Sequence, residues 1–383
     1  MSESDRVPIS RKRFFSTLGG SVVNLLHAQD GSISNLTAKL EETIPELLQT
    51  TGVPGLAVAL IHDAQVVWNR GFGVKSADAK DPVDADTVFE AASLSKPAFG
   101  YVALKLVDTG ELGLDTPLSE YLPAPFVPSE PRLKLITARM ALSHTSGLPH
   151  GRPAGAPITL RFEPGSRFAY SATGFEYLRA VVERLRKQPL AELMKANLLD
   201  PFGMKHSSFG WLGRFEKNYA KGHARNGKMG LSGNGEYLDA TDDEKRQMAK
   251  DYPEYRYPSA AAGMYTTAGD YAKFLCEIMQ SNPDEYRLSP RGTAEMLKMN
   301  VKINDSIGWG LGWGLESTGA GDAFWHWGDW GVFRNFAIGY RRSRSGAVVL
   351  TNSFHGPKAY KKIVSTSTGG NHPAFSWVDE YRG

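Results

Sequence analysis

The sequence predicts an α/β fold, of the α+β kind, in which strands from both ends of the chain surround a helical middle section. Two apolar runs at 55–61 and 65–74, separated by a tight polar turn, predict a pair of strands near the start. The chain after Ile307 is again rich in strand-forming residues, whereas residues 115–258 alternate helical patterns with Pro- and Gly-rich loops. With 383 residues the chain is long enough to bury a large core.

The remaining elements are predicted from the spacing of apolar side chains and from turn residues. Apolar residues that recur on one helical face predict helices at 36–49, 96–107, 174–187, 266–280 and, more briefly, 360–364. Strand patterns on either side of a polar turn predict a β-hairpin at 335–340 and 347–350, and residues 87–92 are also strand-like. Residues 222–243 are polar and Gly-rich, which predicts a surface loop.

A Ser-x-x-Lys sequence, Ser93-Leu94-Ser95-Lys96, stands where the strand-like segment gives way to a helix. Residues three apart on a helix share a face, so the Lys96 amine is expected to lie against the Ser93 hydroxyl. The first turn of a helix also offers free backbone N–H groups and partial positive charge. An acyl-transfer nucleophile needs both features, although Ser93 could equally be a helix cap.

Two further segments carry candidate residues. Tyr170 follows a Pro-Gly turn and precedes the helix at 174–187, so it sits on a loop that enters a helix. Its phenol, with a reference pKa near ~10, would need a neighbouring ammonium such as Lys96 to act as a base. His326-Trp327-Gly328 precedes the predicted hairpin, and Gly328 would let a substrate approach the strand closely.

Composition and charge exclude several classes of function. The net charge of +3 is small for a chain of this length, and nothing in its distribution suggests nucleic acid. One cysteine, Cys276, allows no intrachain disulfide, and it falls on a predicted helix. The histidines are scattered and no His-Glu-x-x-His or Cys-x-x-Cys sequence appears, so the sequence predicts neither a metal nor another cofactor.

Together these pieces resemble the serine β-lactamase and penicillin-binding-protein superfamily, in its class C-like branch of β-lactamases, D,D-peptidases, D-aminopeptidases and related esterases. The resemblance covers roughly residues 36–354. Beyond Ser93, Tyr170 and His326, it rests on segments at 89–96, 110–123, 136–148 and 258–270. It implies a central antiparallel sheet flanked by helices, with an inserted, mostly helical subdomain.

The resemblance also implies roles. Ser93 attacks a carbonyl, Lys96 and Tyr170 move its proton, and His326 stands where relatives have a Lys or His on the strand that lines the site. The backbone N–H groups of Ser93 and Asp329 would form the oxyanion hole.

Two departures from the family pattern narrow the expected substrate. Ala172 stands where relatives have an Asn that helps hold the substrate amide, so an amide substrate loses about 1 kcal/mol of binding. His326 replaces a lysine, and an imidazole with a reference pKa near ~6.5 is mostly neutral at pH 7. The candidate replacement cation is Arg334, eight residues on from His326.

The sequence therefore predicts a serine hydrolase whose first expected activity is hydrolysis of small carboxylic esters. Aromatic side chains near the strand are expected to wall the site for apolar groups, although in a Trp-rich strand they could equally belong to the core: Trp325, Trp327, Trp330 and Phe333. The alternatives are a D,D-peptidase or D-aminopeptidase, a weak class C-like β-lactamase, and a non-catalytic penicillin-binding sensor. The expected partner in each case is a small ester, amide or peptide.

The two ends of the chain suggest its organisation. Residues 1–28, with a basic start and a modest apolar run, resemble a twin-arginine export signal in which one Arg has become Lys. They predict export to the periplasm or beyond; a cytoplasmic protein with a disordered basic tail is the alternative. No stretch is long enough to span a bilayer. Residues 29–383 are expected to form one catalytic domain, with sheet parts at 36–115 and 259–365 and the helical insertion at 116–258.

Overall fold

The computed structural model describes residues 19–127, 130–151, 158–230, 258–280, 286–319 and 321–382. The chain divides into two units, residues 1–44 and 45–383. In the first unit the described residues belong to helix α1 (Gly19–Thr51), which begins well before the helix predicted at 36–49. Most of the predicted export signal lies outside the described residues. None of the helices that the structure describes is long and apolar enough to cross a membrane.

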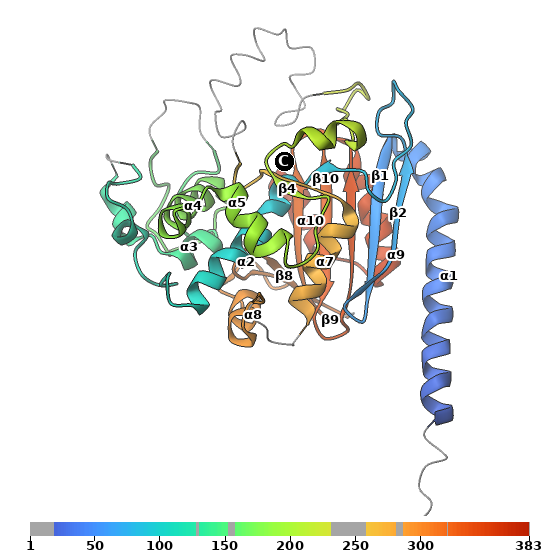
Figure 1. Cartoon of the computed structure of the whole chain (residues 1–383), viewed down its shortest axis with the longest axis horizontal. Coiled ribbons are helices and arrows are strands. Elements are labelled where there is room, and N and C mark those ends of the chain that lie inside the picture. Colours follow the sequence, from blue (N-terminus) through green and yellow to red (C-terminus); the bar gives the residue numbers. More distant parts are fainter. Residues whose placement is uncertain are drawn as a thin grey trace, which may run out of the picture. The chain divides into compact units, whose positions relative to one another are not determined.

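The second unit is built on an antiparallel sheet of eight described strands, in the order β2-β1-β11-β10-β9-β8-β7-β6 (Figure 1). Strands from the two ends of the chain are neighbours, with Leu56 of β1 opposite Thr351 of β11, as the sequence predicts. The bounds are β1 (Gly55–His62), β2 (Gln65–Gly73), β6 (Val301–Lys302), β7 (Ile307–Trp309), β8 (Gly314–Thr318), β9 (Gly321–Asp329), β10 (Arg334–Tyr340) and β11 (Ser345–Thr351).

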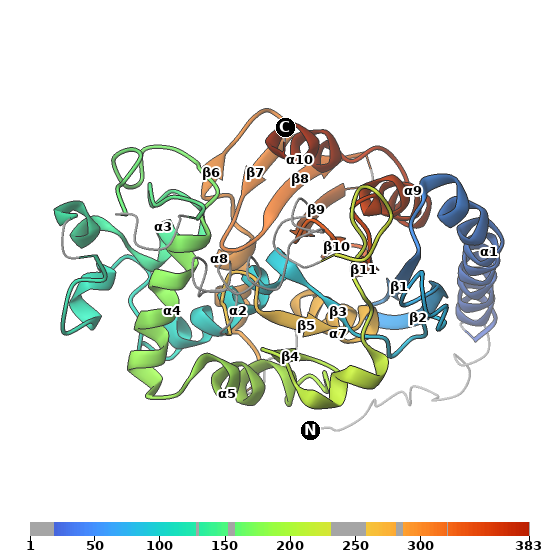
Figure 2. The same cartoon turned by 90° about the horizontal axis from the view of Figure 1, so that it is seen from above.

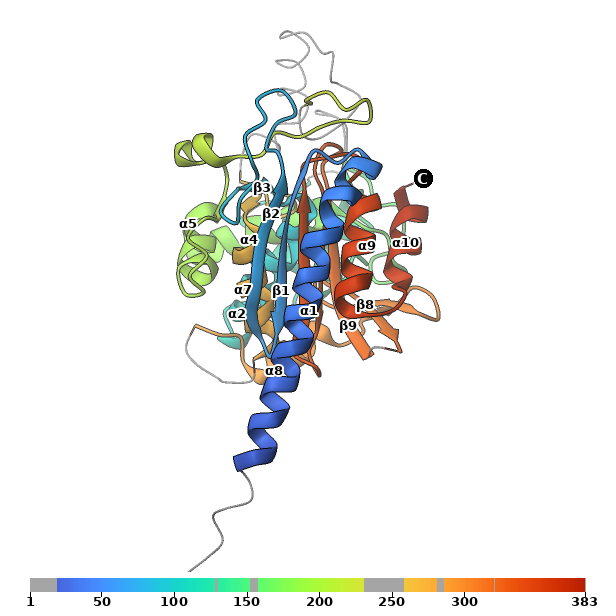
Figure 3. The same cartoon turned by 90° about the vertical axis from the view of Figure 1, so that its right-hand side faces the viewer.

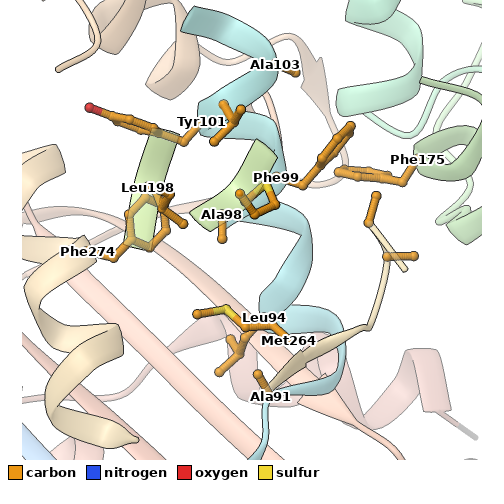
Figure 4. Packing of buried hydrophobic residues seen from close by; sticks show 14 of the residues in the cluster. Ala91, Leu94, Ala98, Phe99, Tyr101, Ala103, Phe175, Leu198, Met264 and Phe274 are labelled. Atoms are coloured by element: carbon orange, nitrogen blue, oxygen red, sulfur yellow. The ribbon is translucent and has the colours of Figure 1, made fainter. Parts of the chain in front are cut away.

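Helices cover both faces of this sheet. Figure 3 shows α9 (Gly356–Thr368) and α10 (Pro373–Arg382) on one face, and α2 (Ser95–Asp108) and α7 (Ala268–Met279) on the other. Helix α2 is buried on almost every side, because its first ten residues are all enclosed. Its Phe99 packs near Phe175, and its Tyr101 packs against Phe274 of α7 (Figure 4).

The middle section places its helices on the side of the sheet away from β1 and β2 (Figure 2), but its later residues return to the segment after β2, where the Lys221 N–H donates to the Lys75 carbonyl. It contributes α3 (Ala138–Leu142), α4 (Ala172–Arg186) and α5 (Leu190–Met194), and α8 (Pro290–Leu297) follows later in the chain. It also contributes one strand, β4 (Ser208–Phe209), to a small sheet with β3 (Phe89–Glu90) and β5 (Met264–Thr266). The segment that was expected to be helical therefore carries strand pairing beside the nucleophile.

Most predicted elements are confirmed, and the C-terminal end differs most. The strand pair, the hairpin and the helices at 96–107, 174–187 and 266–280 are present, with Thr267 capping α7 through the Asp270 N–H. The short helix predicted at 360–364 is part of the longer α9, and α10 was not predicted. The predicted surface loop at 222–243 lies outside the described residues from 231 onward.

Candidate active site

Ser93 is held on a strained turn between β3 and α2. Ala92 has a φ of +51°, a conformation that L residues seldom adopt and that recurs at functional sites. Ser95, at the start of α2, fixes the turn: its hydroxyl donates to the Ala92 carbonyl at 2.6 Å and accepts the Met264 N–H at 2.9 Å. The turn thus carries Ser93 at the N-terminal end of a buried helix.

The Lys96 amine lies next to the Ser93 hydroxyl, as the three-residue spacing predicts. Lys96 Nζ is 3.0 Å from Ser93 Oγ and donates to the Ala261 carbonyl at 2.9 Å. Lys96 is 1% exposed, and burial lowers its pKa to about 7, although the negative charge of Glu176 acts in the opposite direction. Near pH 7 a large share of Lys96 is therefore neutral and has a lone pair that can accept the Ser93 proton.

Glu176 holds the loop that binds Lys96, a role that was not predicted from the sequence. Its Oε1 accepts the Ser259 hydroxyl at 2.6 Å and the Ala261 N–H at 3.1 Å. The carbonyl of the same Ala261 receives the Lys96 amine. Glu176 lies on α4, and in the sequence it resembles any polar residue of an amphipathic helix. Only the fold shows that it lies next to the loop that contains Ala261.

Tyr170 and His326 reach the same place from the middle and the end of the chain. The Tyr170 side chain is 2% exposed, and its ring centre lies 4.8 Å from Lys96 Nζ. Its hydroxyl is 3.5 Å from His326 Nε2, at the long limit of a hydrogen bond. Ser171, the next residue, caps α4 by accepting the Gly174 N–H, so Tyr170 is held directly before the start of this helix. The structure therefore brings together all four side chains that the sequence selected.

His326 is neutral in this position. Its Nδ1 donates to the Trp327 carbonyl at 2.6 Å, which assigns the proton to Nδ1 and leaves the Nε2 lone pair towards Tyr170. Burial, and then the charge of Lys96, lowers the pKa of His326 to about 3. His326 can accept a hydrogen bond from Tyr170, but it supplies no positive charge at ordinary pH.

A second histidine, His144, supports Tyr170. It lies in the family-like segment 136–148, and the sequence did not predict a role for it. Its ring is fully buried and lies 4.2 Å from the Tyr170 ring, centre to centre. Its Nδ1 accepts the Ser171 N–H at 3.0 Å. Burial, followed by the charge of Lys96, lowers the pKa of His144 well below its usual range, so the ring is neutral. His144 fixes both the backbone and the ring face of the Tyr170 segment.

Gly328 has a different partner from the one predicted. A Cβ atom at this position would stand 2.2 Å from the Ala91 carbonyl oxygen, so the glycine lets β9 approach the nucleophile turn rather than a substrate. Asn335 of the neighbouring strand also donates to the Glu90 carbonyl at 2.8 Å. Asp329 follows Gly328 on β9, so its backbone runs beside the turn that carries Ser93. Its role as an oxyanion donor stays a prediction.

Arg334 is already paired, which argues against its predicted role as a replacement cation. Its Nε donates to Asp329 Oδ1 at 3.1 Å, and Nη1 donates to the Phe354 carbonyl at 3.1 Å. The guanidinium also lies 3.8 Å from the centre of the Phe354 ring. Its charge is thus balanced by a carboxylate at the end of β9.

The aromatic side chains that were predicted to wall the site differ in their burial and contacts. Trp327 meets the Tyr170 ring at 4.7 Å, centre to centre. Trp325 is fully buried and stacks on Phe336 at 5.9 Å, centre to centre, so its ring belongs to the core. Phe333 is also buried, and Trp330 is half-buried. Ala172, another predicted substrate-binding residue, is the first residue of α4, and its N–H donates to the His150 carbonyl. Their contact with substrate remains a prediction.

Among the described residues, no group of three or more His, Cys, Asp or Glu side chains is placed to hold a metal ion. Cys276 is buried, and burial raises the pKa of its thiol to about 12. The chemistry that this arrangement offers is that of a hydroxyl with an adjacent neutral amine, a phenol and an imidazole.

Known proteins resemble this chain in sequence and in fold. Esterase EstB from Burkholderia gladioli is 29% identical over 294 residues, which are 65% of this chain and 71% of EstB. Protein flp from Staphylococcus aureus (strain N315) is 25% identical over 206 residues, and the match spans 49% of this chain but only 41% of flp. The solved structure of EstCE1, a hydrolase with promiscuous acyltransferase activity, has a TM-score of 0.71 at 20% identity and covers 88% of this chain and 99% of its own.

The family model described as Beta-lactamase matches residues 40–364, which is most of the chain. The match begins before β1 and ends within α9, so it includes the Ser93 turn, the Tyr170 loop and strand β9. The protein belongs to the beta-lactamase family, within the serine β-lactamase and penicillin-binding-protein superfamily, and is a serine hydrolase.

Proposed function

We propose that this protein hydrolyses small carboxylic esters through an acyl-enzyme formed on Ser93. The observation that carries the proposal is the Lys96 amine, 3.0 Å from Ser93 Oγ, with a pKa lowered to about 7 by burial. A serine hydroxyl is a weak nucleophile unless a base removes its proton, and an amine with this pKa is well matched to that task near neutral pH.

The proposed reaction proceeds in two steps. Lys96 accepts the Ser93 proton as Oγ bonds to the acyl carbon, and the backbone N–H groups of Ser93 and Asp329 hold the oxyanion. The bond between the acyl carbon and the alcohol oxygen then breaks, and Tyr170 delivers the proton to the leaving alcohol. Water then attacks the acyl carbon while Tyr170 takes a proton from it. The bond to Ser93 Oγ breaks, and Lys96 returns its proton to Ser93. Before the reaction the neutral His326 accepts a hydrogen bond from the Tyr170 hydroxyl, which turns to the alcohol oxygen when it delivers its proton.

The charges in the site favour an ester over a β-lactam or a D-peptide. Both of those substrates carry a carboxylate, which a nearby permanent cation would bind. His326 is neutral because burial lowers its pKa to about 3, and Arg334 is paired with Asp329. Ala172 adds no side-chain hydrogen bond for an amide. The similarity to esterase EstB supports the same choice.

The pH dependence of the reaction follows from Lys96. The reactive form is the neutral amine, so kcat/KM for p-nitrophenyl acetate is expected to rise with pH and to level off above about 7. The rate is measured between pH 5 and 9, after subtraction of the rate of the Ser93→Ala variant at each pH. A profile that is flat over this range, or that falls as the pH rises, would mean that Lys96 is not the base.

A panel of substrates separates the proposal from its alternatives. We expect kcat/KM for p-nitrophenyl acetate to exceed that for a chromogenic cephalosporin or a D-Ala-D-Ala peptide by about 10- to 100-fold, the value of a missing charged hydrogen bond. The matched variant Ala172→Asn should shift this ratio towards the amides. Faster cleavage of the peptide would favour a peptidase. A long-lived penicillin adduct on Ser93 without ester turnover would favour a sensor.

A further inference from the structure

Helix α10 (Pro373–Arg382) lies beyond the part of the chain that the family model matches. That match ends at residue 364, within α9. Figure 3 shows α10 beside α9, and α10 contacts strand β8 of the sheet.

The start of α10 is anchored by a buried hydrogen bond between a histidine and a carboxyl group. The side chains of Glu316, on β8, and His372 are both fully buried, and His372 Nδ1 is 2.6 Å from Glu316 Oε1. The second carboxylate oxygen of Glu316 accepts the Ala374 N–H at 2.9 Å, and His372 Nε2 is 2.9 Å from the Thr368 hydroxyl. A buried pair whose polar atoms are all bonded fixes geometry, since separating the partners is costly. The anchor therefore sets where the rest of α10 lies.

The far end of α10 carries two aromatic rings to the candidate active site. Trp377 packs against Trp327 at 5.6 Å, centre to centre, and Tyr381 stacks on Trp377 at 5.2 Å with 24° between the rings. Tyr381 also stands edge-on to Tyr170 at 5.8 Å. Tyr170 is 2% exposed, whereas Tyr381 is 43% exposed. Tyr381 is therefore an accessible ring that directly contacts the proposed proton donor.

We propose that Tyr381, supported by Trp377, binds the alcohol portion of the ester and selects flat, aromatic alcohols such as benzyl alcohol. The proposal rests on the function proposed above. Tyr170 delivers its proton to the alcohol oxygen as the bond to the acyl carbon breaks, so the alcohol must pass beside the Tyr170 ring. Tyr381 contacts that ring edge-on. Its own aromatic face would stack on a flat alcohol ring better than on a saturated ring.

The test compares acetate esters that differ only in the alcohol. Benzyl acetate and cyclohexylmethyl acetate have alcohols of similar size, one flat and one puckered, and both form the same acetyl-enzyme. Their kcat/KM values therefore report the step in which the alcohol leaves. Tyr381→Ala is expected to lower the preference for benzyl acetate by about 3- to 10-fold, the range of one aromatic contact. Tyr381→Phe, which keeps the ring, should retain the preference.

Controls separate this proposal from the one on which it rests. Tyr286→Ala removes another exposed tyrosine, 53% exposed and away from α10 in the sequence, and should leave the ratio unchanged. Binding of benzyl acetate to Ser93→Ala, with and without Tyr381→Ala, is measured by calorimetry without turnover. Two results would overturn the role of Tyr381: the same affinity for benzyl acetate in these two proteins, or an equal loss of rate for the two esters in Tyr381→Ala. Neither result would affect the proposal that the protein hydrolyses esters through Ser93. Absence of that turnover in the wild type would overturn the proposed function instead.

Discussion

Replacing Ser93 with alanine is expected to lower kcat/KM for p-nitrophenyl acetate by about 10³-fold or more, because loss of the nucleophile removes the covalent route. The oxyanion donors are backbone groups and stay in place. A residual rate above that of water would therefore measure what the rest of the site contributes. The rate is measured with purified protein under initial-velocity conditions.

The Ser93→Ala protein should remain folded. The hydroxyl makes one hydrogen bond to Lys96, whose loss changes the free energy of unfolding by about 1 kcal/mol. Urea denaturation checks this point and separates a catalytic loss from an unfolded protein. A variant that is fully folded and within tenfold of the wild-type rate would show that another residue is the nucleophile.

Replacing Lys96 with methionine is expected to reduce activity by about 10²- to 10⁴-fold, the usual contribution of a positioned base, and at the same time to stabilise the fold at acidic pH. The amine is fully enclosed, and burial lowers its pKa from 10.5 to about 7. Below pH 7 the folded protein therefore holds a charge that it has desolvated. Methionine has a similar length, carries no charge and adapts to an irregular cavity.

The sign of the stability effect depends on pH. Between pH 7 and 10.5 the unfolded chain binds the Lys96 proton more tightly than the folded protein does, so this group makes the wild type more stable as pH rises through that window. The methionine variant lacks this contribution. At pH 6 it should unfold with a free energy about 1–3 kcal/mol higher than wild type, after the lost bond to the Ala261 carbonyl is counted. Near pH 10 that advantage should disappear.

Lys105→Met, on the same helix, is the control for placing a methionine in α2. It should retain ester hydrolysis. If Lys96→Met is less stable than wild type at pH 6, or keeps the wild-type rate, the buried amine is not the desolvated catalytic base that we propose.

The local parts of the site could be predicted from sequence because short-range geometry determines them. Ser93 and Lys96 are three residues apart at the start of a helix, and that spacing alone brings the amine to the hydroxyl. The hairpin after His326 follows from alternating side chains and a polar turn, and β10 and β11 pair as expected. The position of Tyr170 was suggested by the turn before it and the helix after it, and the family resemblance joined the three segments.

The rest depends on contacts between distant segments, which no local pattern encodes. Glu176 reaches the Ala261 loop 85 residues away, and Arg334 is neutralised by a carboxylate on the neighbouring strand. A glycine at position 328 indicates that another group comes close to this strand. The sequence does not show that this group is the Ala91 backbone. Trp325 and Trp327 are two residues apart, yet only Trp327 contacts the Tyr170 ring while Trp325 stacks in the core. The C-terminal helix had no motif to indicate a place beside the site.

The most direct test of the central claim is to find the acyl group on the protein. Wild-type protein mixed with p-nitrophenyl acetate and quenched with acid within the first turnover is digested and examined by mass spectrometry. An acetyl group on the peptide that contains Ser93, absent from the Ser93→Ala protein, is the predicted result. Rapid ester hydrolysis with the acetyl group on another residue, or with the same labelling in Ser93→Ala, would contradict the account.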